Sequence, residues 1–429
     1  MKISILGGVA CAALIGLAQP AIAAAASPAF PASATFADGA PTAHADGAIW
    51  LENGQANAAA RQFIDILDRA SLDGLASGPA LASRARSLLD RADNRDPAAA
   101  AEADRLLSSA LVTYVQAIQT PPPGVTYGDS WVVPRQSTPA QILAAAAKAP
   151  ADYVAQVSAV NPVYAKLRDA AYAEMQLTGA PADDRVVASL ARVREAPFQK
   201  RYIIVDAASA TLWMIEDGSI AGQMKVIVGK AEAPTPMIAS TIYRATLNPY
   251  WNVPGDLVKS LIAPRVAAQG VSYLTERNYD VLSGYGDDAT PVDPASVDWA
   301  AVAEGSTIVK LRRGPGPANS MGKMKFGFPN ANDIFLHDTP NKELFASEDR
   351  DLSHGCIRLS DAPRLARFLL GRDASEVTSD IPEQQVLLPT PVPIYVTYLT
   401  AQAKDGRVAF VDDIYGKDRA ITSEVASLR

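Results

Sequence analysis

The chain has 429 residues, of which 48% are hydrophobic, so it is long enough for two or three domains with cores of their own. Its 46 acidic side chains outnumber its 39 basic ones, and no basic tail argues for a nucleic-acid partner. Beyond the N-terminal segment, no apolar run is long enough to span a bilayer.

The first 23 residues are typical of a cleaved secretory signal. Lys2 precedes an apolar run, and residues 21–23 (Ala-Ile-Ala) fit the small-x-small site that signal peptidases cut. Cys11 lies inside the run and resembles a lipidation site only loosely, so we favour cleavage over lipidation. Cleavage would leave Cys356 as the one cysteine of an exported chain, which excludes an intramolecular disulfide.

The next two segments differ in hydrophobic pattern. Residues 24–47 are rich in Ala, Pro, Ser and Gly and lack periodicity, which predicts a flexible tether. Residues 48–196 have the period of helices, and we expect a helical domain there. Asp96 followed by Pro97 suits a helix start, and the proline run at 121–124 suits its end.

Near Tyr202 the hydrophobic period changes from 3.6 to about 2, which indicates strands. Residues 201–230 predict three short strands. Further strand-like runs follow at Ile242–Leu247, Thr307–Leu311, Ile334–Leu336 and Val392–Leu399. We therefore predict an α+β fold, in which a helical N-terminal domain precedes a mostly β domain at 197–429.

A long insertion, at about 253–305, separates two of these runs. It is rich in Pro, Gly and Asp and has hydrophobic residues of its own. Long structured loops over a sheet are often lids or binding loops, so we expect this segment to cap the site. We expect Gly270, Gly284 and Gly286 to act as its hinges.

Residues 333–361 hold two of the three histidines and the only cysteine beyond residue 11. His337, His354 and Cys356 could be ordinary core residues, or they could supply three zinc ligands, although no Cys-x-x-Cys or His-x-x-x-His pair accompanies them. Alternatively, Cys356 is a nucleophile with a histidine base. Gly355 favours this third interpretation, because a glycine beside the nucleophile permits the close backbone approach of an oxyanion hole.

The sequence Ser-His-Gly-Cys-Ile-Arg at 353–358, with His337 seventeen residues before His354, resembles the signature of the YkuD-type L,D-transpeptidase catalytic domain. Longer stretches such as NSMGKMKFGFPN and DRLLSSALVTYVQAI are similar to the large subgroup that carries a helical scaffold domain and a capping insertion. The resemblance covers about residues 48–420.

The resemblance implies a role for each residue of the motif. Cys356 would be the nucleophile and His337 its base, oriented by the Asp338 carbonyl, while His354 is the rival base. The residues implied for the oxyanion hole or for shaping the site are Ser353, His354, Gly355, Arg358 and Asp338, and the candidate substrate contacts are Tyr250, Trp251, Lys325 and Phe335. For Arg358, a buried ion pair is the alternative.

The implied reaction is acyl transfer on peptidoglycan stem peptides in the periplasm, with no metal, cofactor or nucleic acid. Cysteine would release the terminal D-Ala of a tetrapeptide stem, and the side-chain amine of a diamino acid on a second stem would take the acyl group, forming a 3-3 cross-link. An L,D-carboxypeptidase, a lipoprotein-attaching enzyme and a non-catalytic wall-binding protein stay open. A sortase-like enzyme lacks its Thr-Leu-x-Thr-Cys context here.

The sequence departs from larger family members in two ways. Residues 185–197 join the helical and catalytic domains directly, without the usual peptidoglycan-binding module, and Phe335 stands where some relatives have tyrosine. Between Gly305 and Asn332 lie five basic side chains and no acidic one, which would either receive stem-peptide carboxylates or form solvated strand faces. Trp299 would either line the groove or pack in a core.

Overall fold

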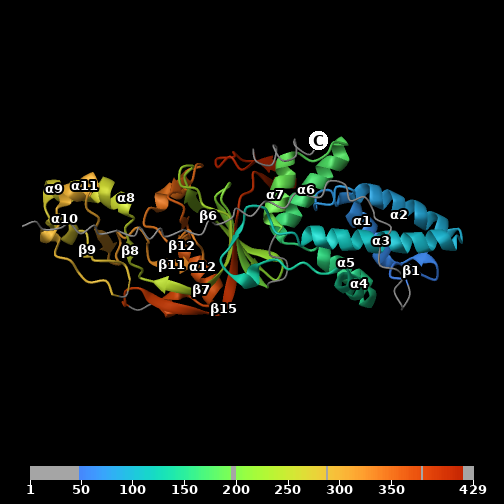
Figure 1. The fold of residues 1–429 in the computed structure, drawn as a ribbon, viewed down its shortest axis with the longest axis horizontal. Helices are drawn as coiled ribbons and strands as arrows, with labels where there is room; N and C mark the ends of the chain where they lie inside the picture. Colours follow the sequence, from blue (N-terminus) through green and yellow to red (C-terminus); the bar gives the residue numbers. More distant parts are fainter. Residues whose placement is uncertain (1–47, 195–199, 287, 378–379, 419–429) are drawn as a thin grey trace, which may run out of the picture. The chain divides into compact units, whose positions relative to one another are not determined.

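The computed structural model describes residues 48–194, 200–286, 288–377 and 380–418 (Figure 1). The expected signal at 1–23, the tether at 24–47, Cys11 and part of the 185–197 join lie outside these residues. Within the described ranges, no helix is both long enough and apolar enough to cross a bilayer.

Helices dominate the chain before residue 195, as predicted. They are α1 (Ala58–Arg69), α2 (Gly78–Asp93), α3 (Pro97–Ile118), α4 (Pro139–Lys148), α5 (Pro150–Ser158), α6 (Pro162–Thr178) and α7 (Asp184–Val193), preceded by the hairpin β1 (Leu51–Glu52) and β2 (Gln55–Ala56), with one 3-10 turn at Ser130–Val132. The Asp96 carboxylate accepts hydrogen bonds from the N–H groups of Ala98 and Ala99, 3.0 and 3.1 Å away, so α3 starts where the sequence predicts.

One large sheet dominates the second half and joins ten strands. They are β3 (Thr126–Tyr127), β4 (Arg201–Asp206), β5 (Thr211–Glu216), β6 (Ser219–Gly229), β7 (Ile238–Leu247), β11 (Met324–Gly327), β12 (Phe335–His337), β13 (Asp351–Ser353), β14 (Ile357–Leu359) and β15 (Gln384–Thr397). Their order is β11-β12-β14-β6-β5-β4-β15-β7-β3, with β13 beside β6, and β11 also pairs with β7, which closes the path from β11 to β7 into a ring. The predicted α+β fold is confirmed.

The sheet buries one face in an apolar core. Ala245, Phe326, Leu336 and Ile357 point into it, and α12 (Ala362–Leu370) packs against the same core. The remaining elements of this half are the hairpin β16 (Ala401–Lys404) and β17 (Arg407–Phe410) and the 3-10 turns at Lys342–Ala346 and Ala374–Glu376. Because side chains alternate along a strand, residues between the core positions of β11, β12 and β14 face the other way.

All four later strand predictions overlap observed strands, although one of the four is displaced along the chain. Thr307–Leu311 was expected to be extended and paired, but the strand found there is β10 (Lys310–Arg313). Its first residue pairs with Leu282, the last residue of β9 (Tyr279–Leu282), so no strand of the described chain pairs with residues 307–309, and the Thr307 N–H donates instead to the Ala301 carbonyl. Ile308 is accordingly 81% exposed.

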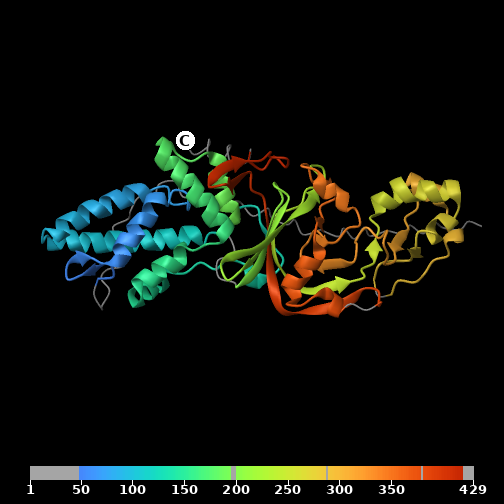
Figure 2. The ribbon, with the colours of Figure 1, turned by 180° about the vertical axis from the view of Figure 1, so that it is seen from behind.

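The insertion folds as a small module with its own core. Its helical segments are α8 (Gly255–Leu257), the π-helical turn Val258–Ile262, α9 (Ala263–Gln269), α10 (Ser272–Thr275), a 3-10 turn at Pro294–Ser296 and α11 (Trp299–Glu304), and they gather around the sheet β8-β10-β9, where β8 is Trp251–Asn252 (yellow segment, Figure 2). Trp299 is buried in this core, so it packs rather than lining a groove.

One of the expected glycine hinges, Gly270, lies at a helix end, and hinge motion stays a prediction for all three glycines. Gly270 ends α9 at a φ of 81°, with its N–H bonded to the Val266 carbonyl, so it serves as a helix cap. A different residue links the two chain segments that connect the module to the large sheet. The buried Asn319 donates to the carbonyls of Pro249 and Gly314, at 2.9 and 3.0 Å. Asn319 thereby joins the chain entering the module to the chain leaving it.

The helical half contributes directly to the large sheet. β3 pairs in parallel with β7, with Thr126 beside Ile238 and Tyr127 beside Ala239. Side chains of α6 and α7, such as Leu167 and Leu190, share a core with residues of β4 and β15. The two halves are therefore joined by a backbone ladder and by side-chain packing.

Candidate active site

The site is built on β12 and β14, which lie side by side in parallel. Leu336 pairs with Ile357 and His337 pairs with Arg358. On the other side of β12, Lys325 of β11 lies opposite His337. The side chains of Arg358, His337 and Lys325 therefore form one row on the sheet face opposite the apolar core, and Cys356 immediately precedes β14.

His337 is held in one tautomer by its own neighbour. Its Nδ1 is 2.6 Å from the carbonyl oxygen of Asp338, and since a carbonyl only accepts, Nδ1 carries the proton and donates it. The Nε2 lone pair is left available. Burial lowers the pKa of His337 to about 4 against the opposing effect of this hydrogen bond, with further lowering from Arg358 and Lys325, so the ring is neutral at pH 7.

The turn before Cys356 has an unusual backbone. Gly355 has a φ of 110°, and a Cβ there would lie 3.0 Å from the Ile334 side chain, so both conformation and space favour glycine. The buried Ser353 hydroxyl donates to the Cys356 carbonyl at 2.6 Å and accepts the Gly355 N–H at 3.1 Å. The Gly355 N–H is thus already engaged within the turn.

Thr235 supports this turn from the other side, although no sequence motif marks it as a site residue. Its hydroxyl donates to the Gly355 carbonyl at 2.7 Å and accepts the Gly229 N–H at 2.9 Å. The Tyr415 hydroxyl in turn donates to the Gly229 carbonyl and lies 3.3 Å from the Thr235 N–H. A threonine between two prolines, 120 residues from Gly355, matches no local motif that would have marked it.

Cys356 rests as a thiol. Burial raises its pKa, and the Phe335 N–H, Lys325 and Arg358 only partly offset that rise. The thiol lies 3.7 Å from the Asp333 carbonyl, a distance suited to a weak S–H donor. Cys356 and His337 are therefore both neutral at rest, and the thiol of Cys356 would have to give up its proton before sulfur could act as a nucleophile.

The cations of the row have no carboxylate partner within the described part of the chain. Arg358 is half-buried yet forms no ion pair there, so the buried ion pair considered for it is not found. Lys325 places its ammonium over the Phe335 ring, 4.3 Å from the centroid. Arg358 and Lys325 thus lie on either side of His337, and no carboxylate of the described residues pairs with them, although the chain is acidic overall.

Three other candidates lie apart from this row. His354 is exposed and makes no hydrogen bond to any residue that the structure describes. Tyr250 and Trp251 belong to the base of the insertion: the Tyr250 N–H donates to Glu383 at 2.7 Å, and Trp251 packs against the core of the module. The structure does not bring these two aromatic residues into contact with Cys356 or His337.

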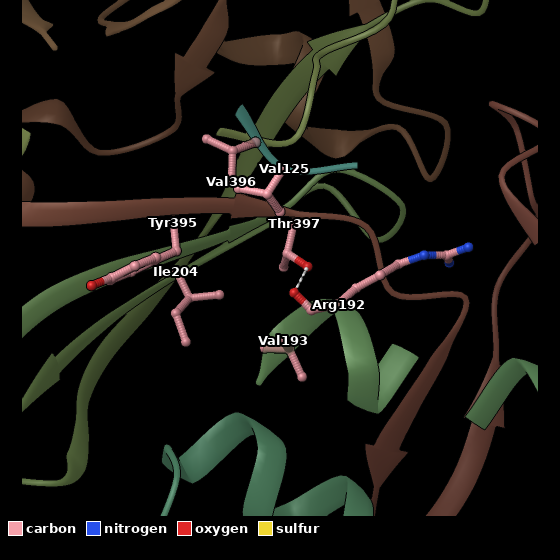
Figure 3. Close-up of a pocket in the computed structure, with 7 residues that line it drawn as sticks. All are labelled: Val125, Arg192, Val193, Ile204, Tyr395, Val396 and Thr397. Atoms are coloured by element: carbon pink, nitrogen blue, oxygen red, sulfur yellow. Dashed lines mark hydrogen bonds between the residues drawn. The ribbon is translucent and has the colours of Figure 1, made fainter. Parts of the chain in front are cut away.

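No group of three or more His, Cys, Asp or Glu side chains is arranged to hold a metal in the described ranges. A small hollow lies where α7 approaches β4 and β15, lined by Val125, Arg192, Val193, Ile204, Tyr395, Val396 and Thr397 (Figure 3). The Thr397 hydroxyl there donates to the Arg192 carbonyl at 3.0 Å. No residue of the Cys356 turn contributes to this hollow, which is a packing gap between the two halves.

Known proteins match this chain in both halves. Residues 200–394 match the model of an L,D-transpeptidase catalytic domain, and residues 42–170 match the model of a scaffold domain. A Haemophilus influenzae protein that carries the provisional name L,D-transpeptidase is 33% identical over 241 residues, covering 54% of this chain and 47% of that protein. The chain therefore spans about half the length of this curated relative.

Solved structures overlay part of the chain. A Cys-to-Ser variant of the Enterococcus faecium L,D-transpeptidase is 13% identical, with 48% of this chain and 52% of that chain covered and a TM-score of 0.23. L,D-transpeptidase 3 from Mycobacterium tuberculosis, with a faropenem-derived adduct, is 14% identical, with 46% and 60% covered and a TM-score of 0.23. The similarity of this chain to L,D-transpeptidases therefore rests on the matches to the two family models and on the curated relative.

Proposed function

We propose that this chain, whose residues 200–394 match an L,D-transpeptidase catalytic domain and whose residues 42–170 match a scaffold domain, cross-links peptidoglycan stem peptides in the periplasm. One observation carries this proposal: neutral His337, with Nε2 available, lies in the strand beside β14, which Cys356 immediately precedes. The N-terminal signal pattern supports the periplasmic location.

In the first step, His337 Nε2 takes the thiol proton of Cys356 while sulfur bonds to the carbonyl carbon of the third stem residue. The carbon–nitrogen bond to D-Ala then breaks, and the imidazolium gives its proton to the leaving amine. A thioester remains. Because the Gly355 N–H is engaged by Ser353, the oxyanion would depend on neighbouring amides such as that of Cys356.

In the second step, the side-chain amine of a second stem attacks the thioester and gives a proton to His337. The thiolate leaves and recovers that proton, so no net redox change occurs. Arg358 and Lys325, which lack carboxylate partners within the described residues, are suited to bind the carboxylates of donor or acceptor. We therefore propose stem peptides as the partners of this site.

The proposal is tested with purified tetrapeptide muropeptides and mass spectrometry of the products. We expect release of D-Ala and formation of a dimer joined between two third-position residues. Tripeptide as the sole product would identify an L,D-carboxypeptidase, and attachment of a lipoprotein amine would identify that variant of the reaction. Binding without any product, together with no covalent adduct from a carbapenem, would show a non-catalytic wall-binding protein.

We also propose that the insertion at 253–305 excludes water from the thioester. Its separate core and the Asn319 tie support movement as one unit. Joining the chain near Val253 to the chain near Thr307 should leave Cys356 reactive toward small acylating agents but lower the ratio of cross-linked dimer to tripeptide. An unchanged ratio in a folded variant would show that the module is not a catalytic lid.

A further inference from the structure

Lys342 connects the ends of the two strands that build the site. Its ammonium nitrogen is 2.7 Å from Asp338 Oδ1, 3.0 Å from the Leu359 carbonyl and 3.0 Å from the Ser360 carbonyl. An ammonium has three N–H groups, so these three acceptors use its full capacity. Asp338 follows β12 and Ser360 follows β14, so one side chain ties the strand of His337 to the strand that follows Cys356.

Asp338 links Lys342 to the catalytic ring. Its carboxylate accepts the Lys342 ammonium on Oδ1 and the Lys323 backbone N–H, at 2.9 Å, on Oδ2. Its carbonyl accepts the proton on His337 Nδ1. Gly322 makes room for this arrangement, since a Cβ there would lie 2.4 Å from the Asp338 carboxylate. The carbonyl that selects the tautomer therefore belongs to a residue fixed at both carboxylate oxygens.

A purely stabilising role accounts poorly for these contacts. The Lys342 side chain is 45% exposed, and exposed ion pairs contribute little to stability. The three bonds of Lys342 instead fix the ends of β12 and β14 relative to each other. Within the described residues, no other side chain bonds to both Asp338 and the end of β14.

We infer that Lys342 is a positioning residue: it fixes Asp338 so that the carbonyl keeps the proton on His337 Nδ1 and leaves Nε2 to accept the thiol proton of Cys356. The catalytic consequence rests on the proposed function. The effect on the histidine tautomer does not, and it is measured without any substrate.

The test uses the full chain labelled with 15N-histidine, which contains only three histidines. In the parent at pH 7, the nitrogen shifts of His337, assigned by their loss in His337→Gln, should report one neutral tautomer with the proton on Nδ1. In Lys342→Met we expect a mixture of tautomers. Carbapenem acylation of Cys356 should also slow by roughly tenfold to a hundredfold, as expected for a misplaced catalytic group.

Lys323→Met is the matched control, because it removes a nearby exposed cation while keeping the backbone N–H that binds Asp338. It should leave both the tautomer and the acylation rate within about twofold of the parent. Should Lys342→Met fail to fold, Asp338→Asn serves instead, since it weakens the ammonium contact and retains the backbone carbonyl.

An unchanged His337 tautomer in folded Lys342→Met overturns the inference, as does an equal shift in Lys323→Met. If the parent is never acylated but the tautomer still shifts only in Lys342→Met, the positioning role stands and the proposed function falls.

Discussion

Two regions of this protein bury ionisable groups, and they differ in whether the charged side chains have oppositely charged partners. In the helical half, the fully buried Asp73 accepts hydrogen bonds from Tyr164 at 2.6 Å and Tyr114 at 3.1 Å, and Arg168 lies 3.4 Å away. Burial, followed by the Asp73 charge, raises the pKa of both tyrosines, so they remain neutral donors. The one negative charge there has a cationic partner and two hydroxyl donors.

On the catalytic face, Arg358 and Lys325 have no carboxylate partner among the described residues, while His337 and Cys356 are neutral. The difference indicates what each region is for. In a balanced buried cluster each charge depends on its partner, and removal of one is costly, whereas unpaired cations beside a candidate nucleophile are suited to a charge that arrives with a ligand.

The strongest way to separate the two regions is Cys356→Ala. Without sulfur no thioester can form, so carbapenem adducts and muropeptide products should fall below detection. The free energy of unfolding should change by only about 1 kcal/mol, because the substitution removes a single partly exposed atom. Intact-mass spectrometry and chemical denaturation measure the two quantities, and residual cross-linking would contradict the mechanism.

His337→Gln tests which histidine is the base. Loss of the neutral imidazole should slow acylation by roughly 10²- to 10⁴-fold at pH 7, since general-base catalysis is removed. His354→Gln should cost far less, because that side chain is exposed and makes no hydrogen bond within the described chain. A larger loss in His354→Gln than in His337→Gln would reverse the assignment.

Asp73→Ala addresses the balanced cluster. It leaves Arg168 buried without its carboxylate, which should lower the free energy of unfolding by about 3–5 kcal/mol, while the folded fraction keeps parental acylation kinetics. Asp169→Ala is the control, since that carboxylate is 62% exposed and contacts the same arginine at 3.6 Å. It should cost less than about 1 kcal/mol. Comparable losses in both variants would remove the distinction between the two regions.

Arg358→Met should have the smallest and most selective effect. Acylation of the parent should rise as pH increases through about 4, where His337 loses its proton. Burial chiefly lowers the pKa of His337 to this value, and Asp338, Arg358 and Lys325 modify it. Arg358 lowers the pKa of both His337 and Cys356, so in Arg358→Met the rise of acylation with pH should occur at higher pH.

In the same variant, turnover of a stem with a free carboxylate should fall by roughly tenfold relative to the carboxamide analogue.

Cys356 and His337 could be proposed as nucleophile and base from the sequence, because Cys356 lies in a continuous motif and His337 is seventeen residues before the His354 of that motif. The helix cap at Asp96 was equally visible, since capping depends on adjacent residues. The cationic row was not, because Lys325 reaches His337 only through the register of β11 on β12. Thr235 was invisible for the same reason: its partner Gly355 is brought close by the fold alone.

Gly270 of the insertion shows that one glycine fits two roles. The sequence predicts a hinge there, and the structure shows a helix end, which also favours a positive φ and is marked by the hydrogen bond to Val266. The hinge role stays a prediction. The restraint on the insertion comes instead from Asn319, whose neighbours in sequence give no indication that its amide spans both connections.

The short strand β3 has a consequence for how this protein could be produced in pieces. Thr126 and Tyr127 cover the edge of β7 at Ile238 and Ala239, opposite the side that β15 occupies. An uncovered edge presents unsatisfied amides and carbonyls that recruit strands from other molecules. A chain that begins at residue 197 would lack β3 and would expose this edge of β7. We expect it to be less soluble than the full chain, because Thr126 and Tyr127, which cover the edge, belong to the other half.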